Sequence, residues 1–71
     1  MHKKIKQLRE RHGLAQKDVA ASLGVNPSAV TRWETGEKRP DLVNLVKLAD
    51  LFDVSIDYLL GRTDNPVPVK H

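Results

Sequence analysis

Apolar side chains recur at helical spacing in five short stretches of the chain, and alternating β-branched residues are missing outside the tail segment 67–69. The first two stretches end before Gly13 and Gly24, where a glycine commonly terminates a helix. Their apolar positions are Ile5, Leu8, Val19, Ala20 and Leu23. The pattern predicts an all-α fold.

The third stretch, Asn26 to Glu34, has the best-defined start of the five. Asn26 is suited to accept a backbone N–H as the N-cap, and Pro27 falls at the first helical position, where its missing N–H costs nothing. The second stretch has only Ala15 at the cap position, which costs about 1 kcal/mol relative to a good cap. A helix is therefore predicted to begin sharply at Pro27 and less firmly after Ala15.

A fourth helix is predicted after Asp41, which is suited to cap it, and a fifth over Ile56 to Leu60, with Ser55 before it. The apolar stripe expected on the fourth helix comprises Leu42, Leu45, Leu48, Ala49 and Phe52. We assign residues 1–61 to one domain and expect the polar, proline-containing tail 62–71 to fray.

The 71 residues suffice for one small domain, and the absence of cysteine leaves neither a disulfide nor a thiolate metal site. The longest apolar runs are far short of a membrane span, so we expect a cytoplasmic protein without membrane association. Residues 1–39 hold nine basic and four acidic side chains (net +5), whereas residues 40–71 hold three and five (net −2). This division suits a surface for a polyanion, although a solvated mixed surface fits the charges equally well.

Enzymatic chemistry has little support in the sequence. No Ser-His-Asp order, metal cluster or phosphate loop is present, and His2, His12 and His71 share no metal-ligand spacing. We therefore expect no catalytic residue, no metal, no cofactor and no small-molecule ligand. A binding function is favoured instead.

Residues 16–33 combine two short helices, a small side chain at Ala20 and a turn at Gly24, the pattern of a helix-turn-helix. The stretch LAQKDVAASLGVNPSAVTRWETGEKRP resembles the phage repressor and Cro type of helix-turn-helix, also called the XRE family, and LVKLADLFDVSIDYLLG continues the resemblance. With the first helix, it covers about Ile5 to Gly61. The resemblance implies five helices around one core, with the third in the DNA major groove and the second crossing above the backbone.

The outward positions of the third helix would then be presented to base edges. Arg32 can donate two parallel hydrogen bonds to guanine, Ser28 can donate or accept, and Pro27 offers apolar surface to a thymine methyl. The family often has a long amide at the Ser28 position, so a weaker or water-mediated contact is expected here. The candidate base-contacting residues are Pro27, Ser28, Thr31 and Arg32.

The resemblance also implies contacts to DNA phosphates. Gln16 matches the family's glutamine at the start of the second helix, where free amides and the positive helix end favour an anion. A solvated helix start is the alternative for Gln16, and ordinary loop charges are the alternative for Lys38 and Arg39. The candidate phosphate-contacting residues are Gln16, Lys17, Asn26, Lys38 and Arg39.

Other residues are expected to support the fold. Spacing from Val30 places Trp33 inward, in the core. The resemblance implies a structural ion pair between Arg9 of the first helix and Glu34 at the end of the third. We also expect a positive φ at Asp53, which stands where the family commonly has glycine or asparagine.

The sequence thus predicts a sequence-specific double-stranded DNA-binding transcriptional regulator, a repressor that binds an inverted-repeat operator as a homodimer. An antitoxin or another protein-interaction module with the same fold is the alternative. The chain could also be the DNA-binding part of a longer regulator. The candidate dimer interface comprises Tyr58, Leu59 and the tail segment 67–69.

Overall fold

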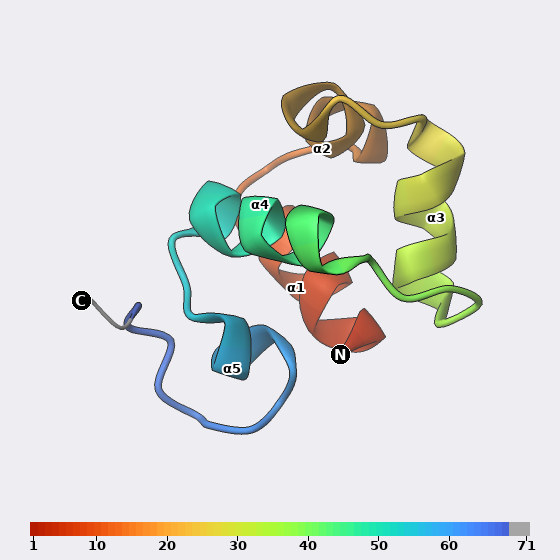
Figure 1. Ribbon diagram of the computed structural model, residues 1–71. Coiled ribbons are helices and arrows are strands. Elements are labelled where there is room, and N and C mark those ends of the chain that lie inside the picture. Colours follow the sequence, from red (N-terminus) through yellow and green to blue (C-terminus); the bar gives the residue numbers. More distant parts are fainter. Residues whose placement is uncertain (69–71) are drawn as a thin grey trace.

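The computed structural model describes residues 1–68, and within this range the chain forms five helices and no strand. The helices are α1 (His2–Arg11), α2 (Gln16–Leu23), α3 (Pro27–Thr35), α4 (Leu42–Phe52) and α5 (Ile56–Leu59) (Figure 1). The predicted all-α fold is therefore confirmed. No helix of this range combines the length and the apolarity that crossing a membrane requires. Val69 and His71 lie outside the described residues.

Three helices begin at the side-chain caps predicted from the sequence. The side chains of Asn26, Asp41 and Ser55 accept backbone N–H groups of α3, α4 and α5 at 3.3, 2.9 and 3.0 Å. Each bond satisfies one of the amides that the first turn of a helix leaves without a partner. The starts of these three helices are thus fixed by neighbouring residues alone.

The ends of α2 are held by charged side chains. α2 begins after Ala15, which has no polar side chain, and the Asp18 carboxylate reaches back to accept the N–H of Ala15 at 2.8 Å. This bond is one half of a capping box, and the negative charge suits the helix N-terminus. At the other end, Lys47 Nζ of α4 donates to the Leu23 carbonyl at 3.2 Å. Asp18 therefore partly offsets the poor cap expected at Ala15.

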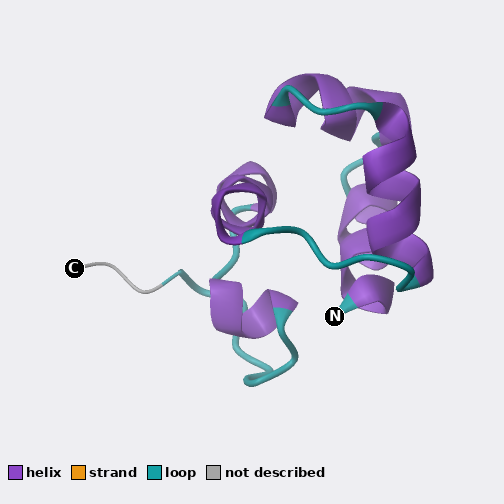
Figure 2. Ribbon diagram, turned by 45° about the vertical axis from the view of Figure 1, so that its right-hand side comes forward, coloured by secondary structure: helices purple, strands orange, loops and turns teal. Residues whose placement is uncertain are grey.

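Residues 24–26 form the tight turn between α2 and α3. Gly24 adopts the left-handed conformation with φ +72°, which a residue without a Cβ reaches at little cost. The N–H of Val25 then donates to the Ala20 carbonyl at 3.0 Å. α2 and α3 consequently meet steeply at one end of the molecule (Figure 1, Figure 2), as a helix-turn-helix requires.

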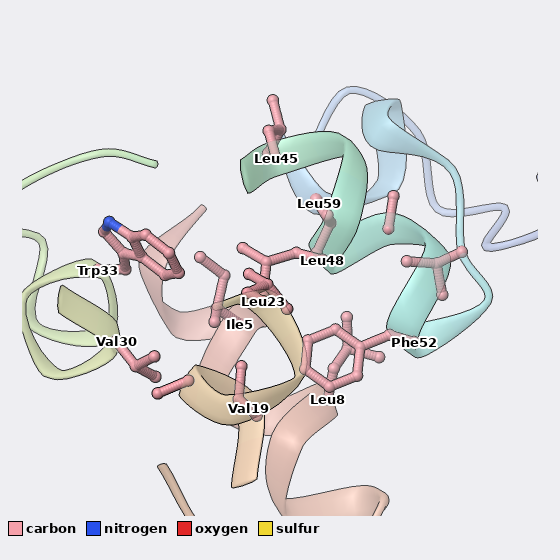
Figure 3. Close-up of a cluster of buried hydrophobic side chains, with 13 residues drawn as sticks. Ile5, Leu8, Val19, Leu23, Val30, Trp33, Leu45, Leu48, Phe52 and Leu59 are labelled. Atoms are coloured by element: carbon pink, nitrogen blue, oxygen red, sulfur yellow. The ribbon is translucent and has the colours of Figure 1, made fainter. Parts of the chain in front are cut away.

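Side chains from all five helices form one apolar core (Figure 3). The fully buried members are Ile5, Val19, Val30, Leu48 and Leu59. Trp33 of α3 is only 6% exposed, which confirms its predicted place in the core. Burial of a large apolar side chain stabilises the fold by about 1.5–3 kcal/mol, and helices this short are marginal alone. The core therefore holds the five helices together.

One apolar position of α4 was predicted wrongly. Leu42 is 72% exposed, whereas the rest of the expected stripe is buried: Leu45, Leu48, Ala49 and Phe52. Leu42 lies on the same side of α4 as Leu45, but it is the first residue of the helix. Pro40, just before the helix, is buried instead. The buried stripe thus stops one turn short of the start of α4.

The chain after α5 turns back toward the start of that helix. The N–H of Arg62 donates to the Asp57 carbonyl at 2.8 Å, and the N–H of Ser55 donates to the Pro66 carbonyl at 3.0 Å. These two bonds connect residues 62–66 to the preceding domain. The domain boundary after Gly61 and the fraying of the tail stay predictions.

Candidate nucleic-acid interface

α3 has one face in the core and the opposite face in solvent. Val30 is fully buried and Trp33 nearly so, whereas Ser28, Thr31 and Arg32 are exposed. Pro27, at the start of α3, is exposed as well. All four candidate base-contacting residues are therefore accessible on one helix that begins at a capped, well-defined position.

Gln16 connects the start of α2 to the exposed face of α3. Its Nε2 donates to Glu34 Oε1 at 3.1 Å, and its Oε1 accepts the hydroxyl of Thr31 at 2.8 Å. Gln16 is half-buried, unlike a freely solvated residue at a helix start. The structure thus brings one candidate phosphate contact and one candidate base contact into a single hydrogen-bonded group.

Arg9 and Glu34 form the predicted ion pair. Arg9 Nε donates to Glu34 Oε2 at 2.6 Å and Arg9 Nη2 donates to Glu34 Oε1 at 3.1 Å. Arg9 Nη1 also donates to the Leu14 carbonyl at 2.8 Å. The side chains are 13% and 3% exposed, so most of the pair is shielded from water. Hydrogen bonding to Glu34 raises the pKa of Arg9 above its ordinary value, although burial acts in the opposite direction.

Arg32 has a weaker partner on the surface. Its Nε lies 3.6 Å from Glu37 Oε2, and the two side chains are 48% and 64% exposed. Exposed pairs of this kind contribute about 0–1 kcal/mol, so little opposes the release of Arg32 to another acceptor. Arg32 is therefore free to reach toward a ligand on the exposed face of α3.

The other candidate phosphate contacts lie near both ends of the helix-turn-helix. Lys17 is exposed in the first turn of α2, and Lys38 and Arg39 are exposed in the loop after α3. Asn26 uses its Oδ1 to cap α3, which leaves its side-chain amide N–H groups for an outside acceptor. These positions supply donors and positive charge around the exposed face of α3.

Two lysines of α1, which the sequence pattern did not single out, lie beside the end of α3. Lys3 and Lys6 line a shallow groove that also includes Glu34 and Thr35 at the end of α3. Their proximity to α3 depends on the packing of α1 against α3, which the sequence pattern does not specify. The expected Arg9–Glu34 pair was the one signal in the sequence for the packing of α1 against α3.

The candidate dimer interface requires a correction. Leu59 is fully buried in the core, so it cannot contact a partner. Tyr58 is half-buried, with Lys4 Nζ 4.2 Å from the centre of its ring. The large apolar side chains that are exposed lie mainly on α4, and the set is Leu42, Val43, Val46, Leu60 and Val67. Helical spacing assigned Leu42 to the core, so the sequence pattern did not predict this exposed apolar surface.

A family model described as Helix-turn-helix matches residues 5–59, so the chain belongs to the helix-turn-helix family. The chain is 43% identical over 65 residues to the uncharacterized HTH-type transcriptional regulator YobD of Bacillus subtilis (strain 168). This match covers 92% of the chain and 58% of YobD. The chain spans about half the length of the curated relatives that it matches first.

Two solved structures confirm the repressor-like fold. The P22 c2 repressor, solved in complex with a synthetic operator, matches with a TM-score of 0.79 and 29% identity, over 82% of this chain and 88% of that one. SinR, described as the master regulator for biofilm formation and solved in complex with DNA, matches with a TM-score of 0.76 and 28% identity, over 83% and 98%. The resemblance to phage repressors is thereby confirmed, and the matched proteins are transcription regulators rather than enzymes.

Proposed function

We propose that this protein is a sequence-specific double-stranded DNA-binding transcriptional regulator, and that it acts as a repressor in the cytoplasm without catalysing a reaction. The observation that carries the proposal is the exposed polar face of α3, held by partly buried hydrogen bonds to α1 and α2. Its setting in the helix-turn-helix family supports the same conclusion, because P22 c2 and SinR were each solved with DNA.

In this proposal α3 lies in the major groove and its exposed residues read base edges. Arg32 donates two hydrogen bonds to guanine O6 and N7, the commonest specific contact of its kind. Pro27, Ser28 and Thr31 meet neighbouring bases from the first turns of the helix. A good bidentate pair discriminates against the wrong base by about 1–3 kcal/mol. Direct contacts of this type give the protein its sequence preference.

A second group of residues fixes the position of the protein on the DNA backbone. The first-turn amides of α2 and the second Nε2 hydrogen of Gln16 bind a phosphate. The remaining backbone contacts come from Lys17, Asn26, Lys38 and Arg39. The excess of positive charge in residues 1–39 supports this division of roles.

The protein binds an inverted-repeat operator as a homodimer, because one recognition helix covers only a few base pairs. The exposed apolar side chains of α4 support a contact there: Leu42, Val43 and Val46 are 72%, 62% and 40% exposed. Exposed apolar residues that cluster on one element commonly mark an interaction surface. Half-sites one helical turn apart, about 10 base pairs, fit this arrangement.

The same α4 surface supports a second candidate function, an antitoxin or other protein-interaction module, in which a different protein covers it. The two functions differ in their dependence on α3. A regulator needs Arg32 for its main activity, whereas an interaction module needs Val43 and not Arg32.

The experiment is selection of bound duplexes from a random DNA pool, followed by affinity measurement for the selected site. Enrichment of an inverted repeat, with the preference relaxed at one base pair of each half-site in Arg32→Ala and fully retained in Glu37→Ala, supports the regulator. Glu37 is the matched control because it shares the surface pair of Arg32. Binding without any enriched sequence contradicts the proposal.

A further inference from the structure

The Glu34 carboxylate fixes the direction of a chain of hydrogen bonds that ends on the exposed face of α3. An ionised carboxylate only accepts hydrogen bonds, and Glu34 already receives two from Arg9. The group of Gln16 that faces Glu34 at 3.1 Å must therefore be its NH2. The amide of Gln16 consequently has one orientation, set by the ion pair.

This orientation turns the amide oxygen of Gln16 toward Thr31. The Thr31 hydroxyl lies 2.8 Å from Gln16 Oε1, and an amide oxygen only accepts, so the hydroxyl must donate. The second neighbour of the hydroxyl, the Pro27 carbonyl at 3.3 Å, is also an acceptor. In either bond, the single proton of Thr31 is used within the protein.

Thr31 is left with oxygen lone pairs and no proton for a ligand. In the major groove, the groups that can donate to such an oxygen are the amino groups N6 of adenine and N4 of cytosine. Guanine O6 and N7 and thymine O4 are acceptors, and meeting one of them requires Thr31 to give up its bond to Gln16. The bond between Thr31 and Gln16 is exposed in the free protein, so its loss becomes costly where the bound DNA excludes water from the Gln16 amide oxygen.

We propose that Thr31 is a specificity-determining residue that selects an adenine or a cytosine through their amino groups, with its polarity imposed by Glu34 through Gln16. This inference rests on the proposed DNA-binding function and names the base chemistry that one residue of the interface recognises. The selectivity follows from hydrogen-bond direction and does not require Thr31 to be rigid in other respects.

The test uses a matched pair of variants of the full chain. Thr31→Val keeps the branched shape and removes the hydroxyl, whereas Thr31→Ser keeps the hydroxyl and removes the methyl. Both are tolerated at an exposed position, and thermal unfolding verifies that they fold. Each variant and the original chain are used to select sites from a random duplex pool.

At one position of each half-site, the original chain and Thr31→Ser should select adenine or cytosine, and Thr31→Val should lose this preference. If that base is adenine, it is replaced by purine, which lacks the 6-amino group. The replacement should weaken binding of the original chain by about 3- to 10-fold and should leave the affinity of Thr31→Val unchanged. If the selected base is cytosine, the same measurement uses the cytosine analogue that lacks the 4-amino group.

Three results overturn the inference: selection of guanine or thymine at the position that responds to Thr31→Val, no response at any position, or loss of preference in Thr31→Ser instead. The last result would assign the contact to the methyl group. Failure of the proposed function looks different, because the original chain would then enrich no sequence at all.

Discussion

Arg9 and Glu34 are 25 residues apart in the chain and are joined by two hydrogen bonds of 2.6 and 3.1 Å between α1 and the end of α3. Glu34 is also bonded to Gln16 of α2, so three helices meet at one carboxylate. The pKa of the Arg9 guanidinium is raised in the folded protein, so the charged form of Arg9 stabilises the fold. This contribution is complete at pH values below the ordinary pKa of arginine and is lost only as the pH rises through the raised pKa. The pair is therefore intact throughout the neutral range.

Glu34→Ala should lower the free energy of unfolding by about 3 kcal/mol, because it leaves Arg9 and Gln16 without their acceptor in a largely buried place. Glu37→Ala is the matched control, since its exposed pair with Arg32 should contribute less than about 1 kcal/mol. Denaturant unfolding measures both. A double-mutant cycle should show that Arg9→Ala and Glu34→Ala are not additive, and additivity would mean that the two residues are not coupled.

Features of the fold that depend on neighbouring residues could be predicted from the sequence. The caps Asn26, Asp41 and Ser55 act within three residues, and Asp53 has the expected positive φ of +53° because its conformation follows from the end of α4. The exposed face of α3 follows from the spacing of its buried residues.

Features that depend on tertiary contacts could not be predicted. Helical spacing gives the side of α4 on which Leu42 lies, but its exposure depends on how far the neighbouring helices extend. Leu59 was wrongly placed at an interface for the same reason. The contact between Gln16 and Thr31 spans 15 residues and depends on the crossing of α2 and α3.

Gly36→Ala should destabilise the fold by more than the φ cost of about 1–2 kcal/mol. Gly36 has φ +83°, which an L-residue adopts at that cost, and an added Cβ would lie 3.1 Å from the ring of His2. His2→Ala combined with Gly36→Ala should recover only the part due to contact with the ring. Gly24→Ala is the control, because its Cβ would meet no atom within 4 Å while φ is similarly positive. Equal losses in both variants would remove the contact with His2 from the explanation.

Binding to duplex DNA should weaken steeply with salt if Lys17, Lys38 and Arg39 contact phosphates. The logarithm of the affinity should fall linearly with the logarithm of the salt concentration, because each neutralised phosphate releases counterions. Each substitution of one of these residues by alanine should reduce the slope by about 1. Lys47→Ala is the control, since Lys47 is directed to the Leu23 carbonyl. A slope that stays unchanged in all three variants would assign the charge dependence to other residues.

Val43→Glu should separate dimer formation from DNA recognition. A carboxylate within the exposed α4 surface would be buried without a partner in a dimer, which is strongly unfavourable. Affinity for an inverted repeat should therefore fall toward the affinity for a single half-site, and the half-site affinity should not change. Val67→Glu, at an equally exposed residue (63% against 62% for Val43), tests the predicted contribution of the tail segment 67–69 in the same assay. Full retention of inverted-repeat binding by Val43→Glu would exclude this surface from the interface.

Arg32 and Lys17 should have different effects on the sequence preference, although both are exposed and positively charged. Arg32 projects from the body of α3, whereas Lys17 lies in the first turn of α2, which crosses outside the groove in the proposed complex. Arg32→Ala should therefore cost about 1–3 kcal/mol on the preferred site and relax the preference at one base pair. Lys17→Ala should weaken preferred and poor sites by similar factors, because a phosphate contact carries no sequence information. Affinities of both variants for a panel of single-base-pair substitutions distinguish the two roles. If Arg32→Ala weakens every member of the panel equally, Arg32 contacts the backbone and the reading surface of α3 lies closer to Ser28 and Thr31.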